Sequence, residues 1–418
     1  MRITAARVTP IAFRDPPLLN VAGVHEPFAL RSIIEVELET GMLGLGESYG
    51  DTQTLAHLDQ IAQRLPGLDP FDLNALARVV DEVVIGHAMQ AEPYPPKGSR
   101  AQAVANGAFE VAFLDLQGQL TGRPLCDIIG GRVRDEIPFS AYLFYKFEKH
   151  INDPGYAPDD WGDCRSHEAM VGQARRMVED FGFGSIKLKA GVFEPDYEIE
   201  TLRHLRRAFP NHPLRIDPNG GWSVQTTRRL MPQLEGLLEY LEDPTNSLAE
   251  MGEVATFAKM PLATNMCTVE FGHIPETIRR NAVQVILSDH HYWGGLRATQ
   301  HLAHLGRIFN IGISMHSNSH MGISLAAMTH VGATIPNLAY ACDTHYPWQV
   351  EEVITGGKLP IRNGCVAVPP GPGLGVTLDR NALARLHQQY LDCGIRKRDD
   401  ATEMRKYDPT FNATRPRF

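Results

Sequence analysis

From about Glu136 onward, short apolar segments alternate with amphipathic ones, and this alternation limits the possible folds more than any other feature of the chain. The apolar segments read as buried strands, and after a longer first interval they recur every 20 to 30 residues. Eight strands that are each followed by a helix predict a TIM-type (β/α) barrel over 136–370, since about 235 residues is a typical length for that fold. The expected strands are centred near Ser140, Lys187, Ile216, Tyr240, Ala263, Ile286, Ser314 and Ala341.

An open, doubly wound sheet would show a similar alternation. No glycine-rich phosphate-binding fingerprint follows an expected strand, and this weakens the alternative. Over 1–135, strand-like runs precede helix-period stretches, which predicts an α+β capping domain that covers the barrel mouth. Residues 371–418 predict a turn, a short strand and a helix that pack back on the capping domain, with an extended polar stretch from 400.

Charge and composition exclude several classes of partner. A formal net charge of −9 argues against nucleic acid or an anionic membrane as partner, and no apolar run approaches the ~20 residues of a membrane span. The start of the chain has no apolar core or cleavage site of a secretory signal. The six cysteines are scattered without a CxxC pair, which favours a reducing cytoplasm.

Three of the expected strands end in oxygen-bearing side chains. Asp217 closes LRIDPNG, Glu242 closes LEYLEDP and Asn265 closes LATNM. Each residue alone could be a helix N-cap or a loop residue. The carboxyl ends of neighbouring barrel strands meet at one edge, however, so the three side chains should lie together. Two carboxylates and one amide oxygen predict an Mg²⁺ site.

Two further groups of residues predict proton transfer beside that metal. Lys187 and Lys189 stand at positions i and i+2 of one strand, so both side chains point to the same face. A charged, solvated rim is the simpler alternative for such a pair. Inside a barrel, mutual repulsion and a nearby cation favour loss of a proton from one lysine, which suits it to act as a base. Asp289 and His316 end the next two strands and predict an acid/base pair in which the carboxylate orients the imidazole.

Together these residues resemble the enolase superfamily, and in detail its glucarate dehydratase subgroup. The supporting strings extend through most of the chain, and Asn265 is a specific mark because most of the superfamily has a carboxylate there. The strings are HEPFALRS (25–32), SIKLKAGV (185–192), RIDPNGGW (215–222), LEDP (241–244), ATNM (263–266), SDHHYW (288–293), SMHSNSHMGISLA (314–326), CDTHYPWQ (342–349) and KRDDA (397–401).

The resemblance implies an Mg²⁺-dependent dehydration of an acid sugar, most simply of D-glucarate to 5-dehydro-4-deoxy-D-glucarate. It implies that Lys189 is the base on one face, with Lys187 contacting the substrate carboxylate, and that His316 is the base on the other face and the acid for the departing hydroxide. Asn318 would help to stabilise the intermediate. Residues His25, Asn106, His345 and Arg398 would contact the substrate, Arg398 through its planar fork to the distal carboxylate. A homo-oligomer is also expected.

Two departures from the subgroup bear on the substrate. Asn106 stands where a threonine is expected, and NSHMG follows His316 where a second asparagine and an aspartate are expected. The alternatives are therefore a dehydratase for another hexarate or for a monocarboxylic sugar acid, an epimerase or racemase with the same two opposed bases, and a barrel that keeps the scaffold without activity.

Overall fold

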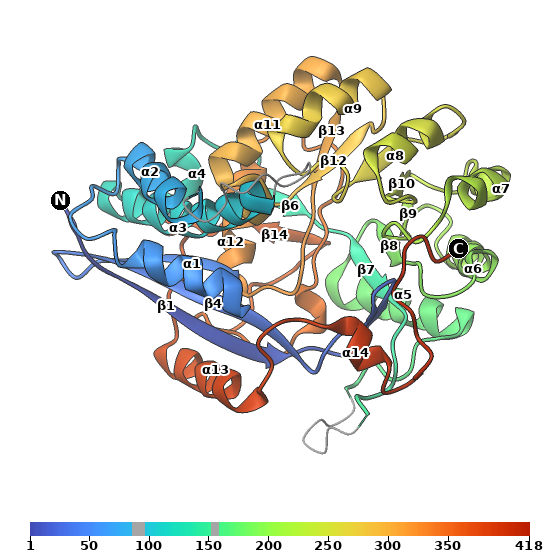
Figure 1. Cartoon of the computed structure of the whole chain (residues 1–418), viewed down its shortest axis with the longest axis horizontal. Coiled ribbons are helices and arrows are strands. Elements are labelled where there is room, and N and C mark those ends of the chain that lie inside the picture. The colour runs from blue at the N-terminus through green and yellow to red at the C-terminus, as the bar shows by residue number, and fades with distance from the viewer. Residues whose placement is uncertain (86–96, 152–158) are drawn as a thin grey trace.

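The computed structural model describes residues 1–85, 97–151 and 159–418. Figure 1 shows two regions: a barrel of strands wrapped by helices, and an N-terminal sheet with its own helices beside it. The barrel contains a seven-stranded parallel sheet in the order β13-β12-β11-β10-β9-β8-β7. These strands are β7 (Ala141–Phe144), β8 (Ile186–Lys189), β9 (Leu214–Asp217), β10 (Tyr240–Glu242), β11 (Leu262–Thr264), β12 (Val285–Ser288) and β13 (Gly312–Met315).

The eighth strand expected near Ala341 is replaced by an irregular segment that still closes the barrel. Its residues form isolated bridges with both neighbours, Leu338 with Ile313 on one side and Cys342 with Phe139 on the other. Because the backbone hydrogen bonds are divided between β13 and the entry to β7, neither pairing is long enough to make a strand. The seven strands and this closing segment confirm the barrel fold.

The barrel helices begin where their sequences supply a cap. Ser166, Ser223 and Ser247 each accept a hydrogen bond from the backbone N–H three residues on, which satisfies a donor that has no partner inside the helix. The barrel helices are α5 (His167–Phe181), α6 (Pro195–Ala208), α7 (Val224–Leu234), α8 (Leu248–Ala255), α9 (Ile274–Arg280), α10 (His290–Trp293), α11 (Leu296–Phe309) and α12 (Gly322–Ala333), with short 3₁₀ turns η2 (Phe271–His273) and η3 (Tyr346–Trp348).

The N-terminal region is a three-stranded antiparallel sheet packed on helices. Its strands are β1 (Ile3–Arg14), β4 (Phe28–Leu38) and β5 (Leu43–Tyr49), in the order β1-β4-β5. Its helices are α1 (Thr52–Ala62), α2 (Leu73–Val84), α3 (Lys97–Thr121) and α4 (Leu125–Ile128). Gly44 and Gly46 let α3 approach β5 closely, because a Cβ on either would lie within 2.3 Å of a carbonyl oxygen of α3.

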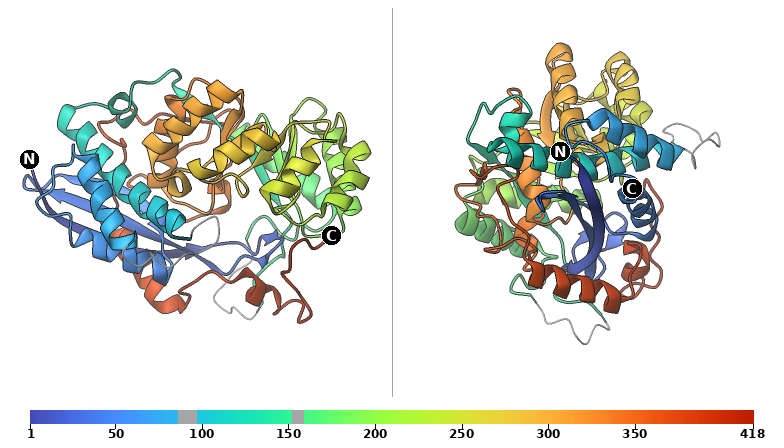
Figure 2. Two further views of the ribbon diagram at one scale, coloured as in Figure 1. Left: turned by 45° about the horizontal axis from the view of Figure 1, so that its top comes forward. Right: turned by 90° about the vertical axis from the view of Figure 1, so that its left-hand side faces the viewer.

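Short strand pairs and the C-terminal segment connect the two regions. The pairs are β2 (Leu19–Asn20) with β3 (Gly23–Val24), and β6 (Glu136–Pro138) with β14 (Cys365–Ala367). Helix α13 (Arg380–Cys393) packs on β1, and Figure 2 shows α13 and α3 on opposite sides of the three-stranded sheet.

The end of the chain departs from the expected extended stretch. Residues Asp400–Met404 form helix α14, because the Asp399 side chain caps it by accepting from Thr402 N. The last residues then reach the barrel, where Ser223 N donates to Phe418 O. Among the described residues, no helix is both long enough and apolar enough to cross a membrane.

Candidate active site

Successive barrel strands place the predicted polar residues at one edge of the sheet. Strand β8 ends at Lys189, β9 at Asp217 and β10 at Glu242, and Asn265 directly follows β11. In the parallel register, Lys189 lies opposite Asp217. The buried, apolar residues of these strands fix the backbone, so the polar residues at their ends are held by the core.

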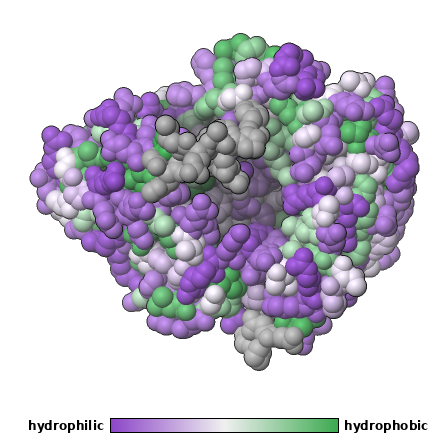
Figure 3. Space-filling view, in the orientation of Figure 1, coloured by the Kyte–Doolittle hydropathy of each residue, from purple (hydrophilic) through white to green (hydrophobic). Residues whose placement is uncertain are grey.

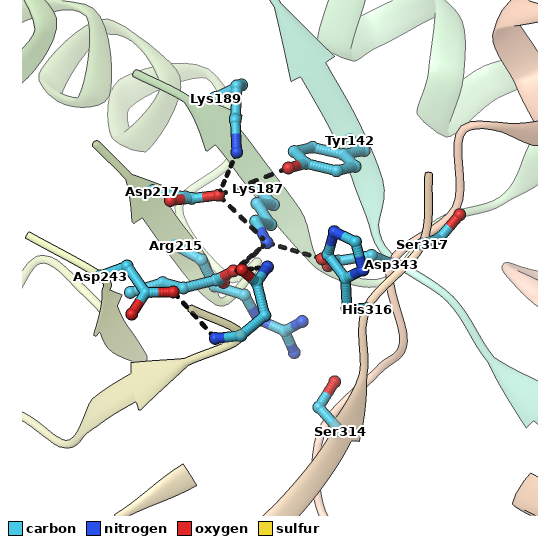
Figure 4. A network of polar contacts seen from close by, with 12 residues as sticks. Tyr142, Lys187, Lys189, Arg215, Asp217, Asp243, Ser314, His316, Ser317 and Asp343 are labelled. Carbon is cyan, nitrogen blue, oxygen red and sulfur yellow. Dashed lines mark hydrogen bonds and ion pairs between the residues drawn. The ribbon is translucent and has the colours of Figure 1, made fainter. Parts of the chain in front are cut away.

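Lys187 lies at the centre of a buried network of charges. Its Nζ atom is 2.7 Å from Glu242 Oε1, 2.6 Å from Asp343 Oδ2 and 3.7 Å from Asp217 Oδ2. Figure 4 shows Lys187 between the carboxylates of Asp217 and Asp343. Burial opposes the charge on Lys187, but Asp343 and Glu242 outweigh it and hold the pKa of Lys187 well above its ordinary value.

Lys189 faces the cavity, whereas Lys187 lies beneath it. The Lys189 side chain is 10% exposed and the Lys187 side chain 0%. Lys189 Nζ donates to Asp217 Oδ2 at 2.6 Å and to Asn219 Oδ1 at 2.9 Å. Asp217 Oδ1 in turn accepts from Asn219 N at 2.8 Å. A substrate in the cavity would therefore meet Lys189 first.

The three oxygen-bearing residues fit a hard divalent cation. Asp217 and Glu242 share Lys187 as a partner, and Asn265 Nδ2 donates a hydrogen bond to Glu242 Oε1 at 3.0 Å. Burial raises the pKa of Glu242 well above its ordinary value despite the opposing charge of Lys187, whose Nζ lies 2.7 Å from Glu242 Oε2. Asp217 and Asp343 reinforce this shift, so negative charge accumulates around Glu242, and a cation would offset it.

Asp289 and His316 form a hydrogen-bonded pair across two neighbouring strands. Asp289 follows β12 and His316 follows β13. His316 Nδ1 lies 2.9 Å from Asp289 Oδ2, and His291 Nδ1 lies 2.8 Å from Asp289 Oδ1. Burial opposes ionisation of Asp289, but the two imidazoles outweigh it and hold the Asp289 pKa well below its ordinary value. The ionised carboxylate thus fixes Nδ1 of His316 and leaves Nε2 for a substrate.

These groups surround one cavity of about 340 Å³ between the N-terminal region and the barrel. Figure 3 shows a hollow near the middle of this face, bordered by hydrophilic residues. Burial and the nearby His25 hold the pKa of His345 well below its ordinary value, so the imidazole is neutral. Seven residues predicted from the sequence line the cavity: His25, Lys189, Asn265, His316, Asn318, His345 and Arg398.

Two predicted substrate contacts are arranged differently from the expectation. Asn106 is not among the residues that line the cavity, because its Nδ2 donates to Gly294 O and the side chain joins α3 to the barrel instead. Arg398 lines the cavity, but its Nε and Nη2 atoms both donate to Asp400 at 2.6 Å. The fork expected for a substrate carboxylate is already engaged by a protein carboxylate.

Sequence reasoning missed several residues of the site. Asp343 follows the irregular closing segment, and the strand-end rule could have found it within CDTH if applied to the eighth position. Asn219 lies two residues beyond Asp217 and bonds Lys189. Tyr142 and Arg415 line the cavity, and no sequence signal placed them there.

Comparison with known families agrees with this geometry. Residues 169–382 match the model described as enolase C-terminal domain-like, and residues 2–130 match the N-terminal domain of mandelate racemase and muconate lactonizing enzyme. The chain belongs to the enolase superfamily. The resemblance inferred from the strand-end residues is thereby confirmed, as is a barrel with an N-terminal capping domain.

Several superfamily members are similar over nearly the whole chain. A probable glucarate dehydratase from Streptomyces coelicolor is 49% identical, covering 98% of this chain and 97% of its own. An enolase from Pseudomonas fluorescens, crystallised with magnesium, potassium and tartrate, is 54% identical with a TM-score of 0.97, covering 100% of this chain and 99% of its own. An enolase from Mycobacterium smegmatis, complexed with tartrate, is 52% identical with a TM-score of 0.94, and the match covers 100% of this chain and 98% of its own.

Proposed function

We propose that this superfamily member catalyses the Mg²⁺-dependent dehydration of a dicarboxylic sugar acid, with D-glucarate as the first candidate and 5-dehydro-4-deoxy-D-glucarate as its product. The observation that carries the proposal is that Lys189 and His316, the latter hydrogen-bonded to Asp289, line one cavity together with Asn265. The probable glucarate dehydratase supports the reaction, and the magnesium-bound relative supports the metal.

Asp217, Glu242 and Asn265 would hold the ion, Asn265 through its amide oxygen. When bound, Mg²⁺ would act as a Lewis acid on the substrate carboxylate and so favour removal of the neighbouring α-proton. Lys187, kept charged by Glu242 and Asp343, would donate a hydrogen bond to the same carboxylate.

Proton transfer would be divided between the two remaining groups. Lys189 Nζ would take the α-proton, so that the C–H electron pair forms a carbon–carbon double bond as the β-hydroxyl leaves. His316 Nε2 would give the leaving hydroxyl its proton and release it as water. The remaining enol would take up a proton at carbon and lose the proton of its hydroxyl group, and so become the 2-keto-3-deoxy acid. This assignment needs Lys189 without its proton and His316 with one.

A second candidate keeps the chemistry and changes the dicarboxylate. Two of the similar structures carry tartrate, a four-carbon dicarboxylic sugar acid. Their cavities accept a shorter molecule than glucarate, which favours a panel of four- to six-carbon diacids over glucarate alone.

The deciding experiment incubates the purified protein and Mg²⁺ with such a panel and with the matching monocarboxylic acids. Keto-acid formation is followed with semicarbazide, and proton exchange is followed in D₂O. Keto acid from glucarate, abolished by EDTA and restored by Mg²⁺, supports the proposal. Exchange of the α-proton without keto acid identifies an epimerase or racemase. Neither product nor exchange with any acid refutes dehydration and favours a barrel without activity.

A further inference from the structure

Arg415 brings a guanidinium group into the cavity from the end of the chain. It lines the same cavity as Lys189 and His316, although both residues lie far from it along the chain. Within the described ranges, its side chain makes no hydrogen bond or ion pair. The arginine therefore has a binding surface that no group of the described residues uses.

The other cations of the cavity already have partners. Lys189 is bonded to Asp217, and Arg398 is bonded through two nitrogens to Asp400. Arg100 lies over the ring of Tyr292, with its central carbon 3.8 Å from the ring centre. Because the Arg398–Asp400 pair is neutral as a unit, Arg415 contributes positive charge that this pair does not.

The backbone holds Arg415 in place. Arg417 N and Phe418 N donate to Gly221 O at 2.8 and 2.9 Å, and Ser223 N donates to Phe418 O at 2.7 Å. Gly221 and Ser223 belong to the loop that follows Asp217. The end of the chain is therefore attached to a loop of the active site. Figure 1 shows this end of the chain beside the barrel.

The surroundings of Arg415 suit an incoming anion. Burial lowers the pKa of Arg415, while the charges of Asp217 and Asp400 oppose that shift. A partly desolvated guanidinium without a partner is costly, and a carboxylate that binds both arms of its fork would offset the cost. Asp217 is a predicted metal ligand, so a cation there would remove part of the negative field that Arg415 now experiences.

We propose that Arg415 binds the distal carboxylate of the substrate and thereby selects dicarboxylic over monocarboxylic sugar acids. The inference rests on the proposed function for the identity of the substrate. In that scheme the proximal carboxylate has Lys187 and the metal as partners. The distal carboxylate would meet two arginines: the guanidinium of Arg398 is bonded to Asp400, whereas that of Arg415 is available.

The test compares binding of tartrate with binding of threonate, which has a CH₂OH group in place of one carboxylate. Calorimetry on the full chain with Mg²⁺ is expected to give tighter binding of tartrate by the wild type. Arg415→Gln should weaken tartrate binding by about ten- to a hundredfold and leave threonate within about twofold. Arg415→Lys should restore part of the loss, because a lysine supplies the charge without the fork. Arg405→Gln, which removes an exposed arginine of the same segment, is the control and should change neither value.

Turnover gives an independent reading. For any dicarboxylate that the enzyme converts, Arg415→Gln should raise KM by the same factor and change kcat by less than about threefold, because Arg415 does not touch the reacting carbons. Equal tartrate affinity in the wild type and Arg415→Gln, equal loss for tartrate and threonate, or a wild type that does not prefer tartrate would each overturn the inference. If no sugar acid is converted, the proposed function fails, while the binding comparison still decides the role of Arg415.

Discussion

Lys187 Nζ donates a 2.6 Å hydrogen bond to Asp343 Oδ2, and this buried pair joins strand β8 to the segment that closes the barrel. Both side chains are fully shielded from water. The pair therefore connects the stability of the barrel to the charge of its active site, since Lys187 also contacts Glu242.

Asp343→Asn is expected to destabilise the protein by roughly 3 kcal/mol, because it removes one carboxylate from a buried ammonium group. Urea denaturation of both proteins at pH 7 measures the difference in unfolding free energy. Asp160→Asn, which changes an exposed aspartate, is the control and should be neutral. A loss no larger than that of the control would show that Glu242 alone satisfies Lys187.

Lys189→Met should lower kcat for the converted sugar acid by about 10³-fold, within the range for loss of a general base. Keto-acid formation measures the rate, and Lys259→Met, on the exposed surface, is the matched control. Tartrate binding within a few-fold of the wild type would show that the cavity is intact. Undiminished turnover in Lys189→Met would refute the role assigned to this lysine.

The strand-end residues could be predicted because the alternation of strands and helices is a local pattern. Asp217, Glu242 and Asn265 each close an apolar run, so their position on one edge follows from the barrel geometry. The same reasoning brought Asp289 next to His316. It required no knowledge of how the cap and barrel pack.

Residues placed by non-local contacts could not be predicted in this way. The KRDD run shows opposite charges, but only the turn into α14 brings Arg398 onto Asp400. Arg415 reaches the cavity through backbone hydrogen bonds of its neighbours, which leave no side-chain pattern in the sequence.

Asn265→Ala should weaken Mg²⁺ binding by about ten- to a hundredfold, because one of three protein oxygens is lost. Isothermal titration with MgCl₂ measures the dissociation constant. Asn265→Asp is the matched comparison, since it keeps an oxygen at this position and should bind Mg²⁺ more tightly than the alanine variant. Equal Mg²⁺ affinity in the wild type and Asn265→Ala would exclude Asn265 as a ligand.

Asp289→Asn should reduce kcat by about 10²-fold with a smaller change in KM, because the amide no longer fixes the His316 tautomer or its charge. Steady-state assays of keto-acid formation from pH 6 to 9 measure both constants. Unchanged tartrate affinity would show that the fold is retained. A variant with the kcat and pH profile of the wild type would mean that the 2.9 Å contact with His316 has no part in turnover.

Stability should depend on pH through Glu110, a buried residue of α3 that accepts a 2.6 Å hydrogen bond from Leu296 N at the start of α11. Burial raises the pKa of Glu110 to about 7, although Leu296 and Arg297 oppose the shift. The folded protein thus binds a proton at the Glu110 carboxylate more tightly than the unfolded chain does. The contribution to stability is fully present below the unfolded pKa of about 4.3 and is lost as the pH rises through about 7.

Glu110→Gln cannot ionise, so its unfolding free energy relative to the wild type should improve by about 3 kcal/mol between pH 4.5 and pH 8. Urea denaturation at half-unit pH steps measures this difference. Glu253→Gln, on an exposed face of α8, controls for the loss of one negative charge and should parallel the wild type. If the Glu110→Gln and wild-type curves stay parallel across this range, Glu110 is ionised in the folded protein, and its two backbone donors outweigh the cost of burial.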